Sequence, residues 1–308
     1  MTTPYAPSSA TPPARAAQGP GSGHAPPLPE RRAHLGHAIA SEWTKIRSVR
    51  STVWTLAVLF ALVVGVGLLV AVGMSGSAYL DMPVLSGGFF GLMLGQLAVI
   101  TLGVLVVTSE YSTGMIRSTM TVCPQRGRVL SAKAIVFFLL SFVMTLAACG
   151  ITAVIQSAVL EGKPLSPYAD TASTGEASRA AGEAVVTSGE WLDATVGAAL
   201  YVALLGLLSL AVGTLLRSTP GAVTTMLGLV LVPFIVSLFL TTENTFELGE
   251  TIREYSTLNG LATLFHIPIE LSSADPGTPN GWPLLGVLAA VTAAALAAAY
   301  ARIALRDV

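Results

Sequence analysis

The sequence Glu110–Lys133, EYSTGMIRSTMTVCPQRGRVLSAK, lies between two long apolar runs, at 88–107 and 134–159. It is too polar to cross a membrane and short enough to be an ordered connector. It also holds four of the sixteen Lys and Arg residues of the chain. The pattern predicts two membrane-spanning helices joined by a basic connector, on which another protein pushes.

The composition extends this prediction to the whole chain. Hydrophobic residues make up 53% and charged residues 11%, about half of the charged share of a soluble domain. Runs of about 20 apolar residues can cross a bilayer core of about 30 Å, where each backbone must satisfy its own hydrogen bonds. The runs do not alternate as barrel strands would. The sequence therefore predicts an all-α polytopic membrane protein with six spans: 53–72, 88–107, 134–159, 194–216, 221–240 and 283–301.

The basic residues predict the orientation of these spans. If the N-terminus is cytoplasmic, thirteen Lys and Arg residues lie on the cytoplasmic side and three outside. An excess of Lys and Arg near short loops marks the cytoplasmic side of a membrane protein. We therefore expect both termini in the cytoplasm of a multi-pass plasma-membrane protein, with outer loops at 160–193 and 241–281.

The chain before the first span divides into two parts. Residues 1–33 are rich in proline and predict a disordered cytoplasmic tail, whereas 34–308 form the transmembrane domain. Apolar residues recur every three or four positions over 34–50, which predicts an amphipathic interfacial helix. This helix either only anchors the chain beside the membrane or, in addition, contacts a cytoplasmic partner. Its candidate lipid-facing residues are Ile39, Trp43, Lys45, Ile46, Arg47 and Arg50.

The two long outer loops differ in composition. The loop at 160–193 is rich in Ala, Ser, Thr, Gly and Glu, and we expect it to be solvated and poorly ordered. Within the second loop, residues 257–271 are apolar but too short to span. They predict a re-entrant segment between the fifth and sixth spans. A loop folded on the outer face is the alternative.

Small and polar residues within the second and third spans suggest how these helices pack. Gly87, Gly91 and Gly95 repeat every four residues, a spacing that lets helices approach closely. The contact would lie within one subunit or across a dimer. Gln96 and Gln156 either make interhelical hydrogen bonds or line a substrate path.

Several kinds of chemistry are missing from the sequence. No span carries an ionisable residue at its middle, which argues against ion-driven transport and against intramembrane proteolysis. The chain has no HExxH, GxSxG or GxxxxGK[ST] motif and no pattern of metal ligands, so we expect no enzyme activity and no metal site. Any ATP-driven work would need another chain.

Three stretches resemble a known family: SEWTKIRSVRST at 41–52, SEYSTGMIRSTMTVCPQRGRVLSAK at 109–133 and RDV at 306–308. They are similar to the membrane subunit, or permease, of ABC-2 type ABC transporters in the style common in actinobacteria. The middle stretch carries the most specific features: Glu110, the pair Gly114-Met115, Pro124 with Arg126, and Lys133. Met115 departs from the family, in which Thr is more usual. The resemblance covers 41–308.

The resemblance implies the permease subunit of an ATP-driven exporter that works as a homodimer with separate ATPase subunits. ATP and Mg²⁺ would bind to those partners, no cofactor would bind to this chain, and no nucleic-acid partner is expected. A non-transporting scaffold or sensor is the alternative. Glu110 either pairs with Lys133 or contacts the partner. The implied coupling residues are Glu110, Tyr111, Ser112, Thr113, Gly114, Met115, Ile116 and Arg117.

Overall fold

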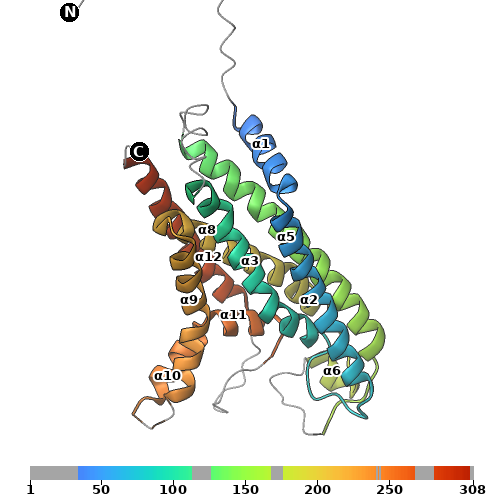
Figure 1. The fold of residues 1–308 in the computed structure, drawn as a ribbon. Helices are drawn as coiled ribbons and strands as arrows, with labels where there is room; N and C mark the ends of the chain where they lie inside the picture. Colours follow the sequence, from blue (N-terminus) through green and yellow to red (C-terminus); the bar gives the residue numbers. More distant parts are fainter. Residues whose placement is uncertain are drawn as a thin grey trace, which may run out of the picture. The chain divides into compact units, whose positions relative to one another are not determined.

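The computed structural model describes residues 34–112, 126–167, 176–240, 242, 244–267 and 281–305 (Figure 1). The proline-rich tail, residues 113–125 of the connector and the final stretch 306–308 lie outside the described residues. The helices are α1 (Leu35–Ser48), α2 (Arg50–Ser75), α3 (Ser86–Ser112), α5 (Arg126–Leu160), α6 (Glu176–Ala181), α7 (Ser188–Leu192), the π-helix η1 (Asp193–Gly197), α8 (Ala198–Leu216), α9 (Thr219–Phe239), α10 (Phe246–Glu254), α11 (Thr257–Leu264) and α12 (Gly281–Leu305).

Helices long and apolar enough to cross a membrane account for most of the described chain. They number six in that part of the chain: α2, α3, α5, the continuous α7–η1–α8, α9 and α12. Each begins a few residues before the predicted apolar run, because that run marks only the part inside hydrocarbon. The structure thus confirms the all-α polytopic class and the six spans.

Helices α3 and α8 form the centre of the bundle. They pack against each other; α2 covers α3, and α5, α9 and α12 surround α8. Large side chains are fully buried between them, including Leu92, Ile100, Tyr201 and Leu205. Lipid is as apolar as these side chains, so close packing must hold the helices together.

The glycine stripe of α3 packs inside the subunit, against α2. A Cβ atom added to Gly91 would lie 2.7 Å from the Cα of Val63, and one added to Gly95 would lie 2.8 Å from Cδ1 of Leu59. The two helix backbones can approach this closely only because the side chains are absent. Of the two alternatives that the sequence left open, these glycines serve packing within the subunit.

Helix α5 is the longest element and carries α1 on its side. Its 35 residues span about 50 Å, well beyond a hydrocarbon core of about 30 Å. Figure 1 shows α1 and α2 following each other along one flank of α5, and both contact it. Glu42 and Ile46 of α1 are buried there, whereas Trp43 is exposed. The depth of α1 in a membrane remains a prediction.

The segment between the fifth and sixth spans folds back into the bundle. A Cβ atom on Gly249 of α10 would lie 2.7 Å from the carbonyl oxygen of Leu240, just beyond the end of α9. The Thr257 hydroxyl, at the start of α11, donates to the Val230 carbonyl at 3.3 Å. Val230 lies nine residues before the end of α9, so the chain has returned about 14 Å along that helix. The described part of this segment, which ends at residue 267, therefore folds back against α9. Its entry into the membrane stays a prediction.

The prediction of a poorly ordered loop at 160–193 is wrong for its described residues. Backbone hydrogen bonds join Leu80 to Pro164 and Gly162 to Ala184, and Leu80 and Ala184 are buried. The Lys163 ammonium donates to the carbonyls of Met74, Ser75 and Ser77 at 3.1, 2.5 and 3.0 Å, where α2 ends. A few specific contacts therefore order a segment whose average composition is that of a solvated loop.

The close contact at Gly91 can be tested by adding one methyl group. We expect Gly91→Ala to destabilise the protein by about 1–3 kcal/mol, because the new Cβ meets the Val63 backbone and cannot be relieved by a rotamer change. Thermal unfolding in detergent measures the effect. Gly65→Ala on α2 is the matched control, since a Cβ there has no heavy atom within 4 Å. Equal melting temperatures for the two variants would contradict the packing described.

Candidate functional site

Charged residues from three helices meet beside the connector. Glu42 and Lys45 lie one turn apart on α1, Glu110 lies in the last turn of α3, and Lys133 lies in the second turn of α5. Residues 113–125 join the last two helices. We call these four residues the charged cluster and the end of the bundle that carries them the α1 end.

Lys133 is at the centre of the cluster. Its ammonium lies 2.7 Å from Oε2 of Glu42 and 2.9 Å from Oε1 of Glu110. Lys45 also reaches both carboxylates, at 2.8 Å and 3.4 Å. The side chains of Glu42 and Lys133 are 4% and 6% exposed. The local pairing of Glu110 with Lys133, one of the alternatives from the sequence, is therefore present.

The cluster changes the protonation of its α1 members. Burial opposes ionisation of Glu42, but Lys133 and Lys45 outweigh it and hold the pKa of this carboxyl below its ordinary value of 4.5. Burial likewise opposes the charge of Lys45, yet Glu42 and Glu110 raise the pKa of its ammonium above 10.5. All the charges of α1 in this cluster are therefore retained near neutral pH.

Further polar contacts tie α8 and α12 to α3 and α5 at the same end. The Arg217 guanidinium lies over the Tyr111 ring, 5.3 Å from its centroid, and Arg302 donates to the Leu215 carbonyl at 2.6 Å. The hydroxyls of Ser131 and Tyr300 are 2.6 Å apart. These contacts connect the end of α3 with α8, and α12 with α5 and α8.

The structure distributes the predicted coupling residues over two regions. Glu110 belongs to the charged cluster, Tyr111 packs under Arg217, and the exposed Ser112 donates to the Ser109 carbonyl at 3.0 Å. The other five, at 113–117, lie outside the described residues.

The residues predicted for the interfacial helix include both buried and exposed side chains. Ile46 is buried against the protein and Ile39 is half-buried, while Trp43, Arg47 and Arg50 are exposed. Lys45 belongs to the charged cluster. Sequence reasoning missed Glu42, although an acidic residue four positions before Ile46 on an otherwise basic helix is a signal for an inward-facing charge.

Residues 38–167 match the model of a family described as "ABC-2 family transporter protein". The match supports an ABC-2 type permease. All four members of the charged cluster fall inside the matched segment, which contains most of α1 and all of α2, α3 and α5. No curated protein matches the chain. The match and the six apolar helices together support a multi-pass protein of the cell membrane.

The two glutamines of the predicted spans are buried inside the chain. With its amide oriented to satisfy both groups, Gln156 of α5 donates to the Leu85 carbonyl at 3.3 Å and accepts from the Gly87 N–H at 3.0 Å. This is the interhelical bond that the sequence left as one alternative. Gln96 of α3 donates to Met93 of its own helix at 3.3 Å. A role for either in a substrate path stays a prediction.

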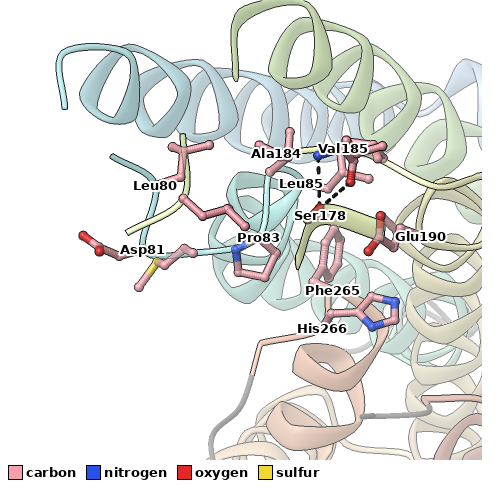
Figure 2. Close-up of a pocket in the computed structure, with 15 residues that line it drawn as sticks. Leu80, Asp81, Pro83, Leu85, Ser178, Ala184, Val185, Glu190, Phe265 and His266 are labelled. Carbon is pink, nitrogen blue, oxygen red and sulfur yellow. Dashed lines mark hydrogen bonds between the residues drawn. The ribbon is translucent and has the colours of Figure 1, made fainter. Parts of the chain in front are cut away.

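The opposite end of the permease contains a small pocket (Figure 2). Leu80, Asp81 and Pro83 line one side, and Phe265 and His266, which follow α11, line another. The Ser178 hydroxyl donates to the Val185 carbonyl at 2.9 Å and accepts from its N–H at 3.0 Å, which fixes a third side (Figure 2). The cavity volume is about 30 Å³, room for about one water molecule. It is too small for a substrate of drug or lipid size.

A carboxylate next to this pocket joins three elements of the fold. Asp193, the first residue of η1, accepts from Nε1 of Trp282 at 2.8 Å and lies 3.2 Å from Nε2 of His266. His266 has φ of 56°, in the left-handed region. A π-helix and a left-handed residue are both uncommon and need support from their surroundings. Asp193 supplies it by bonding the fourth span to the re-entrant segment and to α12. Among the described residues, no group of three His, Cys, Asp or Glu side chains could hold a metal ion.

The charged cluster predicts that loss of each of its two lysines lowers the free energy of unfolding by a different amount. Lys133→Met leaves Glu42 and Glu110 buried with only the partly exposed Lys45, so we expect a loss of about 3–5 kcal/mol in the free energy of unfolding. Lys45→Met removes the same charge from a side chain that is 34% exposed, and should cost less than about 1 kcal/mol. Thermal unfolding in detergent compares them, and a larger loss for Lys45→Met would refute the central place given to Lys133.

The lowered pKa of Glu42 predicts a dependence on acid. A carboxyl whose pKa is lower in the folded state stabilises the protein above its unfolded pKa, here taken as 4.5. That contribution is lost as the pH falls below 4.5 toward the folded value. We expect Tm to fall less steeply below this pH in Glu42→Gln than in the unmodified protein. Glu247→Gln, at an exposed position on α10, should retain the unmodified slope. Parallel curves for Glu42→Gln and the unmodified protein would contradict the ion pairing.

Proposed function

We propose that this chain is the permease subunit of an ATP-driven exporter, coupled through residues 113–117 to a separate ATPase subunit. One observation carries the proposal. Glu110 and Lys133, on the two helices that flank residues 113–125, bind each other and α1 through the charged cluster. A displacement of the connector would therefore move the ends of three helices.

The mechanism assigns the chemistry of ATP to the partner and the movement to this chain. ATP and Mg²⁺ would bind the partner, whose closure would displace the connector. Packed elements linked by a buried ion pair move as rigid bodies rather than bending, so α1, α3 and α5 would shift together. This chain supplies no catalytic residue in the proposal.

The substrate path is proposed to lie between two copies of the subunit. Gln156 is engaged with the start of α3, and the pocket near α11 holds about 30 Å³, so both support a closed interior within one copy. A homodimer would provide a wider path along its interface. Export is the proposed direction because the sequence has no feature for docking a substrate-binding protein.

Replacement of residues 113–117 by a Gly-Ser linker of equal length tests the coupling. We expect the variant to insert and fold as the unmodified permease does, but to lose copurification with its co-expressed ATPase subunit. This choice leaves Glu110 and Tyr111 in place, because both contribute to the folded bundle. Retention of the ATPase subunit at the unmodified level would be inconsistent with the proposed contact.

An equal replacement of residues 171–175, in the predicted outer loop, is the matched control and should retain the ATPase subunit. Reconstituted vesicles containing both subunits then separate a permease from a scaffold or sensor. A permease predicts ATP-dependent movement of substrate that stops with the 113–117 replacement. Stable association without any ATP-dependent movement would favour the scaffold or sensor.

A further inference from the structure

A cavity of about 330 Å³ lies beside the charged cluster, between the α1–α2 junction and the last turns of α3. Its walls are of two kinds. Lys45, Ser51 and Thr52 are on the polar side, and Leu102 and Val106 are on the apolar side. The apolar residues belong to the predicted run at 88–107, whereas Ser51 and Thr52 directly precede the run at 53–72. The cavity therefore straddles the boundary between hydrocarbon and headgroups.

The four charged side chains that line this cavity sum to zero, but the most accessible of them is a cation. Glu42 is 4% and Glu110 14% exposed, and Lys133 lies between them, so both carboxylates are largely neutralised. Lys45, at 34%, is the most exposed of the four. An anionic group on the polar side therefore meets the ammonium of Lys45 first.

We propose that this cavity binds one anionic phospholipid. The phosphate lies against Lys45 and Ser51, and the first methylene groups of an acyl chain lie against Leu102 and Val106. The volume is in the range of ligand pockets and takes the phosphate, the glycerol and the upper chain, while the remaining chain stays in the bilayer. This site is distinct from general attraction between basic residues and the membrane surface, because it has walls that fit one lipid.

The bound lipid would also act on the charged cluster. A phosphate on Lys45 competes with Glu110, whose contact with Lys45 is the longest of the four ion pairs at 3.4 Å. Lys45 would then connect Glu42 to the lipid, and Glu110 would pair with Lys133 alone. The lipid thus becomes part of the contact between α1 and α3.

Native mass spectrometry of the full-length protein, titrated with phosphatidylglycerol or phosphatidylcholine, tests the site. We expect one tightly retained phosphatidylglycerol per chain and about tenfold weaker retention of phosphatidylcholine, whose headgroup cation faces Lys45. Val106→Trp fills the cavity and should lower retention of phosphatidylglycerol by about tenfold. Leu94→Trp, on an exposed part of the same helix, is the matched control and should retain it.

The charge of Lys45 is tested in the same experiment. Lys45→Gln should lower retention of phosphatidylglycerol by about fivefold, and Lys45→Arg should restore it, because either cation can bind a phosphate. The proposal is overturned if no lipid is retained, if Val106→Trp retains as much as Leu94→Trp, or if the two lipids bind equally well. None of these outcomes depends on the ATPase subunit, so the proposed transport function can stand or fall separately.

Discussion

Lys133 imposes the strictest constraint on this structure, because its ammonium is buried and needs the carboxylates of Glu42 and Glu110 beside it. Taking a charge out of water costs several kcal/mol, which only well-placed partners can offset. Those partners come from α1 and α3, so neither helix can shift independently without leaving a charge unpaired. The attachment of α1 illustrates this dependence. Only Glu42 and Ile46 of that helix are buried, and its aromatic residue, Trp43, is exposed. Charge therefore contributes a large part of what holds α1 to α5.

The middle of the bundle depends on a different constraint. Lipid gives no hydrophobic advantage to contact between apolar helices, so the contact must be close enough for dispersion to favour it. The glycines of α3 meet this requirement against α2, where Gly91 faces the Val63 backbone. The segment of α10 and α11 that folds back meets the same requirement on the other side, where Tyr201 donates to the Thr257 carbonyl at 2.8 Å. Close backbone contact and single polar bonds thus replace the hydrophobic drive of a soluble core.

The sequence predicts this fold well where the membrane dictates it. Bilayer thickness sets the length of a span, so six apolar runs translate directly into six helices, and the apolar segment at 257–271 is too short to be a seventh. The sequence predicts the site less completely. Glu110 and Lys133 lie 23 residues apart and were considered as a pair, but Glu42 lies 91 residues from Lys133. No local sequence pattern connects Glu42 with Lys133 at this separation along the chain. The order of the described part of the loop at 160–193 escapes prediction for a related reason: average composition does not reveal that Lys163 and Ala184 make specific contacts.

The position of Lys163 has a mechanical consequence. It follows the end of α5 by three residues and holds the final carbonyls of α2, so these two helices are joined at that end of the bundle. At the other end, the charged cluster joins α5 to α1, which leads directly into α2. Two helices joined at both ends form a frame, so α2 and α5 can neither separate nor slide along each other. When the connector is displaced, the frame of α2 and α5 would then move as one body with α1 and α3. The relative movement would be against α9 and α12, whose described contacts with the frame are few and run mainly through α8.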